Sequence, residues 1–242
     1  MEKFRFGDRE IEYRIKRGKR KKSVAISISD AAQVVVLVPQ SLNKEKIQEI
    51  VQKKARWILE KQTYFKRLKD LFPEKELISG EQFLFAGRKY RLKVREVEEE
   101  CAIEPLMQGR RLIIFVNKGL SKEIRKEIIK EKLVKWYFSS ASELVAQRLR
   151  RYRNMLNIEP AGIIIRNQQK RWGSCSNSGV LRFNWRIAMA PISIIDYVIV
   201  HELCHLKEKN HSREFWRQVS LAVPDYQKRR KWLRENSASL NF

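Results

Sequence analysis

The stretch YVIVHELCHLKEKNHSREFW, residues 197–216, holds all three histidines of this 242-residue chain. His201 and His205 are four residues apart, a spacing that places both side chains on one face of a helix. A predicted chain reversal at Lys209-Asn210 would bring His211 back toward the same point. Three imidazoles that leave one position open suit a catalytic Zn²⁺ ion. The stretch therefore predicts one zinc per chain, held by these three histidines, with another divalent transition metal as an alternative.

Glu202 directly follows the first histidine, so its carboxylate projects near the metal but outside the ligand set. A carboxylate in that place can take a proton from a metal-activated water molecule. The pattern HExxHxxxxxH therefore predicts Glu202 as the catalytic general base. The alternative is a polar helix face with surface histidines. The apolar run IIDYVIV, residues 194–200, indicates a buried helix and favours a metal site.

Local signals predict where the helices around this stretch begin and end. Ser193, followed by Asp196, resembles a capping box and predicts a helix over 194–208. Asn210 suits a left-handed end of that helix. Ser212 is a predicted cap for the next helix, and a basic helix is predicted over 225–236 after a proline.

Hydrophobic periodicity predicts strands and helices over the rest of the chain. The predicted strands are a pair around Gly7-Asp8, then 22–30, 33–39, further strands within 78–96 with turns at Gly80 and Gly87, then 110–116, 161–168 and 179–191. Long helices are predicted over 44–72 and 121–155, and neither a low-complexity segment nor an internal repeat is evident. A boundary near residue 75 predicts a strand-plus-long-helix lobe over 1–75 and a metal-binding lobe over 76–242.

A family resemblance rests on HELCHLKEKNHSREFW together with the upstream stretches RWGSCS, LRFNWRIAMAP and IIDYVIV. These stretches resemble the YgjP-like metallopeptidases, relatives of the SprT-like zincins, over about residues 15–236, which could also form one compact domain. The resemblance implies an α+β fold whose zincin-like catalytic lobe packs the active-site helix on a mixed or antiparallel sheet. It implies zinc on the three histidines, Glu202 as general base and a polypeptide substrate.

The resemblance also implies that an edge strand binds the substrate as an added β-strand, and VLRFNWRIA, residues 180–188, is the expected strand. An ordinary core strand is the alternative. The oxyanion that develops during peptide hydrolysis needs a donor besides the metal. The donors that the sequence offers are Arg171, Asn184, Tyr197 and Tyr226.

With every histidine committed to the metal, Ser174 and Cys175 have no imidazole to activate them as nucleophiles. We expect these residues to form a tight turn near the active-site helix, with Gly173 relieving backbone strain. Cys204 is expected to be a small buried residue.

The chain is strongly basic, with 52 Lys and Arg against 28 Asp and Glu and a formal net charge of +24. Such a field attracts polyanions, and basic runs that contain aromatic residues could contact nucleic acid. Solvated helix faces are the alternative. The candidate nucleic-acid contacts are Lys19, Arg20, Lys21, Arg150, Arg151, Arg229 and Arg230.

Composition limits the compartment and the fold. The chain is 43% hydrophobic, enough for a sizeable core, yet no apolar run is long enough to span a bilayer and no secretory signal is evident. Cys101, Cys175 and Cys204 are odd in number and match no disulfide framework. We therefore expect a cytoplasmic protein without a membrane partner.

The leading hypothesis is a zinc-dependent metallopeptidase that uses Glu202-assisted attack of zinc-activated water on the peptide carbonyl. One alternative keeps the zinc and hydrolyses a nucleoside triphosphate to release pyrophosphate, although no phosphate-cradling glycine motif supports it. Another is a nucleic-acid-associated module with a structural zinc, against which an open metal position and Glu202 both argue.

Overall fold

The structure is a computed structural model that describes residues 1–18, 23–29, 31–98, 103–168 and 170–242. The chain forms two compact units, Met1–Glu74 and Lys75–Phe242, and each is described by itself. Within the described residues, none of the helices combines the length and the apolar character needed to cross a membrane. Lys19, Arg20, Lys21 and Cys101 lie outside the described residues.

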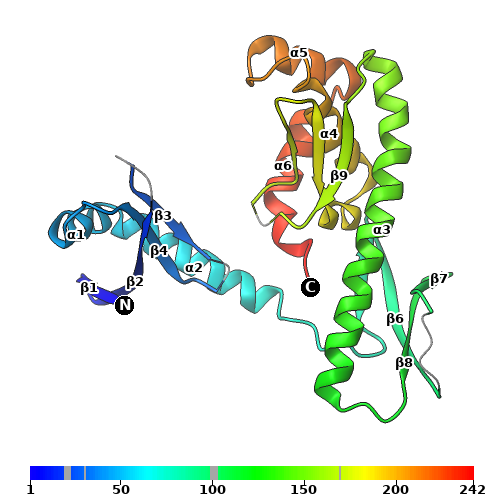
Figure 1. Cartoon of the computed structure of the whole chain (residues 1–242), viewed down its shortest axis with the longest axis horizontal. Helices are drawn as coiled ribbons and strands as arrows, with labels where there is room; N and C mark the ends of the chain where they lie inside the picture. Colours follow the sequence, from blue (N-terminus) through cyan, green and yellow to red (C-terminus); the bar gives the residue numbers. More distant parts are fainter. Residues whose placement is uncertain (19–22, 30, 99–102, 169) are drawn as a thin grey trace. The chain divides into compact units, whose positions relative to one another are not determined.

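The first unit is a four-stranded sheet followed by two helices (Figure 1). Its strands are β1 (Glu2–Phe6), β2 (Arg9–Gly18), β3 (Ala25–Ile28) and β4 (Val34–Pro39), in the order β1-β2-β4-β3. The β1–β2 hairpin turns at Gly7. Its φ of 62° lies in the left-handed region, which glycine adopts more readily than other residues. Strands β2 and β4 run parallel, and the two outer pairs are antiparallel.

The predicted helix over 44–72 is two helices, α1 (Lys44–Lys53) and α2 (Ala55–Leu71), so the prediction of one continuous helix is wrong. At Lys54 the backbone leaves the helical region, and its N–H donates to the Val51 carbonyl at 3.0 Å. Ile47 and Val51 of α1 and Ile58 of α2 are all buried in one core. The break at Lys54 changes the direction of the helix, so that α2 also packs against this core.

The second unit begins with a sheet of the same design, made of β5 (Gln82–Phe85), β6 (Arg88–Val97), β7 (Leu106–Gln108) and β8 (Arg111–Asn117). Its order is β5-β6-β8-β7, with β6 and β8 parallel and the outer pairs antiparallel. The short strand β7 was not predicted from the sequence. The helix that follows, α3 (Lys122–Leu156), is continuous over 35 residues and begins after Ser121, whose side chain caps it.

The two sheet-and-helix segments form an internal repeat, which contradicts the expectation of none. They share strand order and strand direction, and several residues at matching places are identical. Phe4, Phe6 and Arg9 recur at the same spacing as Phe83, Phe85 and Arg88, and LNKE at 42–45 recurs as LSKE at 120–123. The polar positions between these matches differ between the two segments. The repeat is therefore not evident in the sequence, and the shared strand order identifies it. We call Met1–Glu74 the first copy and residues 75–156 the second copy.

After the second copy, three strands form a small mixed sheet in the order β10-β11-β9. These are β9 (Gly162–Arg166), β10 (Gly173–Cys175) and β11 (Val180–Asn184), with β11 antiparallel to β10 and parallel to β9. The predicted strand over 179–191 ends at Asn184, where a 3₁₀ helix, η1 (Trp185–Met189), begins. The expectation that β11 is an edge strand is wrong, because both of its sides are paired. The turn predicted for RWGSCSNSG, residues 171–179, contains the edge strand β10.

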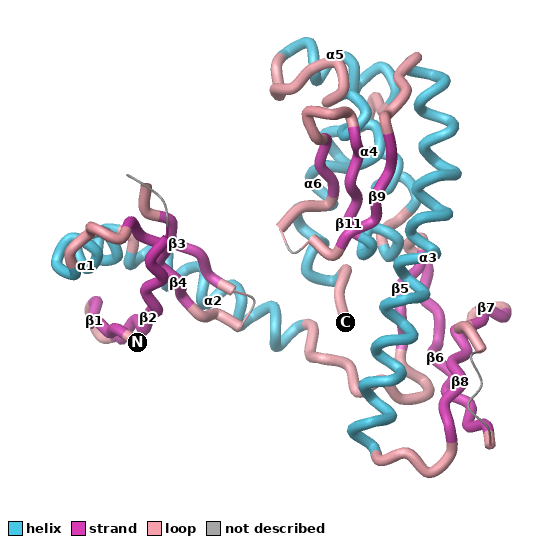
Figure 2. The backbone as a smooth tube through the Cα atoms, viewed as in Figure 1, coloured by secondary structure: helices cyan, strands magenta, loops and turns pink. Residues whose placement is uncertain are grey.

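Three helices complete the second unit: α4 (Ile192–Cys204), α5 (Arg213–Ala222) and α6 (Tyr226–Asn236), followed by a short 3₁₀ helix, η2 (Ser237–Ser239). Helix α4 contacts α3 and the strand β10, and α3, which Figure 2 shows as one long helix, contacts both β9 and β8. The core residues Val145, Leu149 and Tyr152 of α3 are buried in the same cluster as α4. The fold is therefore α+β with mixed sheets, as the sequence analysis expected.

The capping-box prediction for α4 is wrong. The helix begins after Pro191 without a side-chain cap, and it ends at Cys204, well before Asn210, which is not left-handed. Asp196 instead accepts two hydrogen bonds of 2.7 Å from Arg148 of α3, forming a bidentate ion pair. Proline suits a helix start because its missing N–H would be unpaired there.

Candidate metal centre

The structure brings the three histidines together at the end of α4. Their ligand nitrogens lie within 4.8 Å of one another, and the ring centroids of each pair are between 4.8 and 5.0 Å apart. His201 and His205 are half-buried on α4, whereas His211 is exposed on the loop that leads to α5. The helical spacing and the chain reversal predicted from the sequence thus converge on one point.

The nitrogens face each other in a way that suits a cation. The Nε2 atoms of His201 and His211 are 3.1 Å apart. Two ligand nitrogens at about 2.0–2.1 Å from a tetrahedral zinc would be separated by roughly 3.4 Å, so this pair fits with little adjustment. Nδ1 of His205 lies 3.0 Å from the Glu208 carbonyl, a contact that fixes this ring and leaves its Nε2 free. The donor set therefore fits zinc.

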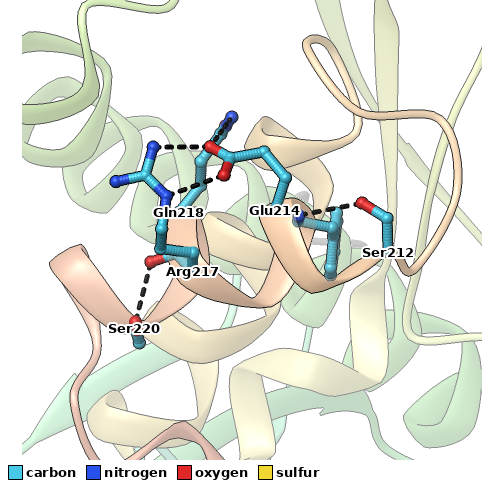
Figure 3. Close-up of polar contacts among 6 residues, drawn as sticks. Ser212, Glu214, Arg217, Gln218 and Ser220 are labelled. Carbon is cyan, nitrogen blue, oxygen red and sulfur yellow. Dashed lines mark hydrogen bonds and ion pairs between the residues drawn. The ribbon is translucent and has the colours of Figure 1, made fainter.

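Helix α5 supports the third histidine. Ser212, the predicted cap, accepts a hydrogen bond of 3.1 Å from the Phe215 N–H, and Figure 3 shows this cap at the start of the helix. In the same view Glu214 pairs with Arg217 one turn later. The cap begins the helix directly after His211, so the loop that carries this ligand has a defined end.

Aromatic rings from α5 surround the histidines. Phe215 stacks on His205 with 4.5 Å between ring centroids, and Trp216 stacks on His211 at 5.5 Å. This apolar setting favours neutral imidazoles. Burial lowers the pKa of His201 to about 3, and the positive charges of its neighbours act in the same direction. Neutral rings are the form that binds a metal.

Glu202 is buried beside the histidines, with 5% of its surface exposed. Burial raises the pKa of its carboxyl group to about 8, opposed by the charge of Arg171. Its side chain packs against the edge strand β10 at Gly173. A Cβ at Gly173 would lie 2.6 Å from both Cγ and Oε1 of Glu202. The absence of a side chain at Gly173 therefore makes room for the carboxylate.

This packing corrects the reason given for Gly173. Its φ is not in the left-handed region, so it relieves no backbone strain. Ser174 and Cys175, expected in a turn, lie in β10, and burial raises the pKa of the Cys175 thiol. Cys204 is fully buried, as expected, and burial raises the pKa of its thiol to about 12. Neither thiol is activated as a nucleophile.

The four oxyanion candidates have different surroundings. Tyr197 is buried, and its ring centroid is 5.8 Å from that of His201. Arg171 is exposed and acts on Glu202 through its charge. Tyr226 stacks on Trp216 at 5.0 Å with 15° between the ring planes.

Asn184 is committed to the fold. Its amide nitrogen donates to the carbonyls of Gln168 and Arg171, and its amide oxygen accepts from the N–H of Arg186. The side chain thus caps η1 and holds the preceding loop. Its donor group therefore already has two carbonyl partners, whereas an oxyanion donor needs an N–H or O–H directed at the substrate.

The basic residues considered for nucleic acid do not share one environment. Arg150 and Arg151 are exposed on α3, and the Arg151 guanidinium lies 5.7 Å from the Tyr152 ring centroid. Arg229 pairs with Asp225 at 2.7 Å and donates to a backbone carbonyl of α4, so it supports the fold. Arg230 lies over Trp216, next to the histidines. No pattern in the sequence distinguishes Arg229 from Arg230.

Two histidines lie one turn apart at the end of a helix, a third comes from the next loop, and a buried glutamate lies beside them. This combination is typical of a metal-dependent hydrolase. The family model described as YgjP-like, metallopeptidase domain, matches residues 22–236. The chain therefore belongs to the YgjP-like metallopeptidase family, as its sequence motifs suggested.

Two solved structures are similar to part of the chain. The metallopeptidase zymogen abylysin of Pyrococcus abyssi is 21% identical, with 38% of this chain and 93% of that chain covered and a TM-score of 0.35. The metallopeptidase zymogen jannalysin of Methanocaldococcus jannaschii is also 21% identical, with 38% and 95% covered and a TM-score of 0.33. No curated protein sequence matches this chain. The family assignment rests on the family model.

Proposed function

We propose that this chain is a zinc-dependent peptidase in which His201, His205 and His211 hold one zinc ion and Glu202 is the general base. The observation that carries the proposal is the convergence of three ligand nitrogens within 4.8 Å beside a buried carboxylate. When bound, zinc would acidify a water molecule and polarise the carbonyl of a peptide bond.

Glu202 is suited to moving the proton. In this proposal its carboxylate takes a proton from the attacking water and then delivers it to the leaving amine. Its burial, which raises its pKa toward neutrality, makes it both an adequate base and an adequate acid. Gly173 lets the carboxylate lie against β10.

Tyr197 is the donor we propose for the oxyanion. Its hydroxyl makes no hydrogen bond to any residue in the described ranges, and its ring lies beside His201. Burial raises the pKa of this phenol to about 12, so it stays protonated and can donate. Arg171, whose charge acts on Glu202, is the second choice.

Strand β10 is the edge that we propose for substrate binding, in place of β11. The Trp172 carbonyl and the Ser176 N–H are bonded to β11. Because hydrogen bonding alternates in an antiparallel pair, the N–H and C=O groups of Gly173 and Cys175 point to the other side. An extended peptide added there would pass Glu202, which packs against Gly173.

The test measures metal content and hydrolysis on the same preparations. Wild-type protein should hold one zinc per chain and hydrolyse an unfolded protein substrate. His205→Ala should lose the metal, and Glu202→Gln should keep it but lose turnover by at least about 100-fold. Nucleoside triphosphate hydrolysis without proteolysis would favour the alternative hydrolase. Retained nucleic-acid binding with no hydrolysis by any preparation would favour a structural zinc.

A further inference from the structure

Arg230 of α6 lies close to the metal centre without belonging to it. Its guanidinium carbon is 5.0 Å from the centroid of the Trp216 ring. The same ring stacks on His211 at 5.5 Å and lies 5.8 Å from His201. The indole thus contacts both the Arg230 guanidinium and the rings of two metal ligands.

The position of Arg230 is well defined for an exposed side chain. Tyr226 and Arg230 are one helical turn apart on α6, which puts them on the same face. Tyr226 stacks on Trp216 with 15° between the planes. Trp216 therefore contacts both α6 side chains, and a guanidinium held near an aromatic ring loses less freedom when it binds a planar partner.

The charge of Arg230 has no acidic partner in the described part of the chain. Its neighbour Arg229, by contrast, pairs with Asp225 and donates to the Ser193 carbonyl. An unpaired arginine beside a substrate site attracts an anion from the substrate.

We propose that Arg230 is a specificity-determining residue that binds a carboxylate of the substrate close to the bond that is cleaved. This inference rests on the proposed peptidase function. The carboxylate comes either from an acidic side chain or from the C-terminus of the peptide, and a guanidinium can bind both through two parallel hydrogen bonds. Arg230 is exposed and contacts Trp216 instead of a metal ligand directly, so it suits substrate recognition better than the oxyanion.

The test measures peptide binding to zinc-loaded Glu202→Gln protein by calorimetry, so it needs no turnover. Three peptides differ only in charge: one with a central Glu and an amidated end, one with Gln and an amidated end, and one with Gln and a free carboxyl end. Arg230→Gln should weaken binding of a carboxylate-bearing peptide by about 10-fold or more, and of the neutral peptide by less than about twofold. The peptide that responds identifies the source of the carboxylate.

Arg234→Gln, one turn further along α6 and also exposed, is the matched control and should leave all three affinities unchanged. Arg230→Lys keeps the charge without the planar fork and should give an intermediate loss for the carboxylate-bearing peptide. Equal losses for all three peptides, no loss, or no measurable binding of either carboxylate-bearing peptide would overturn the proposal. Single-stranded DNA is titrated in the same way. If Arg230→Gln weakened the binding of DNA and of none of the peptides, the proposal would also be overturned.

These outcomes separate this inference from the proposed function. If wild-type protein cleaves no peptide but Arg230-dependent carboxylate binding is observed, the peptidase proposal fails while the binding site stands. If peptides are cleaved at equal rates by wild-type protein and Arg230→Gln, whatever their charge, the peptidase proposal stands and this inference fails.

Discussion

The two copies of the sheet-and-helix segment have the same strand order, yet only the second copy is part of the unit that holds the metal centre. In the first copy the helix breaks at Lys54, and a Cβ added at Gly7 in its hairpin turn would meet nothing within 4 Å. In the second copy the helix is continuous, and its hairpin turn donates from Ala86 and Gly87 to carbonyls of η1. The two copies thus share one topology and differ in their surroundings. The second copy supports the metal centre through its continuous helix, its hairpin turn bonded to η1 and the added region after residue 156.

The largest expected effect concerns the added region, which has no counterpart in the first copy. Gly173→Ala would push the Glu202 carboxylate out of place, since the new Cβ would lie 2.6 Å from its Cγ. We expect peptidase activity to fall by about 100-fold or more while zinc content stays at the wild-type level. Peptidase assays and metal analysis of the same preparation check this, with Gly162→Ala, at a site open to a Cβ, as control. Full activity in Gly173→Ala would show that the carboxylate is placed by other contacts.

The second prediction concerns the extension of α3 beyond its own sheet, where Arg148 pairs with the buried Asp196 of α4. Arg148→Met leaves that carboxylate without its partner, and we expect the free energy of unfolding to fall by about 3 kcal/mol. Combining it with Asp196→Leu removes both charges and should restore most of the loss. Urea unfolding measures both variants. A double variant no more stable than the single one would contradict a role of the charge pair itself.

A matched pair of substitutions compares the two hairpin turns directly. Gly7 and Gly87 both have positive φ, of 62° and 77°. A Cβ at Gly7 meets nothing within 4 Å, whereas one at Gly87 would lie 2.7 Å from the Pro191 Cα. Gly87→Ala should therefore destabilise the protein by about 1–2 kcal/mol more than Gly7→Ala, which costs only the left-handed backbone. Chemical unfolding of both variants measures the difference, and equal costs would mean that the second turn is not tightly docked.

The smallest effect is expected from removing the first copy. All residues of its core lie within Met1–Glu74, and the metal ligands with their neighbours lie within Lys75–Phe242. A chain of residues 75–242 should fold and keep its zinc affinity and its activity on short peptides within about twofold of the whole chain. Metal titration and peptide assays of the two chains test the domain boundary proposed near residue 75. A shortened chain that aggregates or loses zinc would refute it.

Local signals in the sequence were enough to predict the ligand cluster. The spacing of His201 and His205, the cap at Ser212 and the hairpin at Gly7 each depend on residues close together in the chain. The features that were not predicted depend on residues far apart in the chain. The start of α4 was misplaced because Asp196 pairs with Arg148, 48 residues away. The role of Gly173 depends on Glu202, and strand β11 lies in the centre of its sheet because β9 pairs with it.

The continuity of α3 has a thermodynamic consequence. At 1.5 Å per residue the helix is roughly 52 Å long, and its buried residues belong to two cores, with Ile129 and Leu133 in one and Val145 and Leu149 in the other. Neither core can open fully without exposing part of the same helix. Zinc captured by the folded state would therefore protect amides of the distant β5–β8 sheet from hydrogen exchange, by coupling both cores into one cooperative unit.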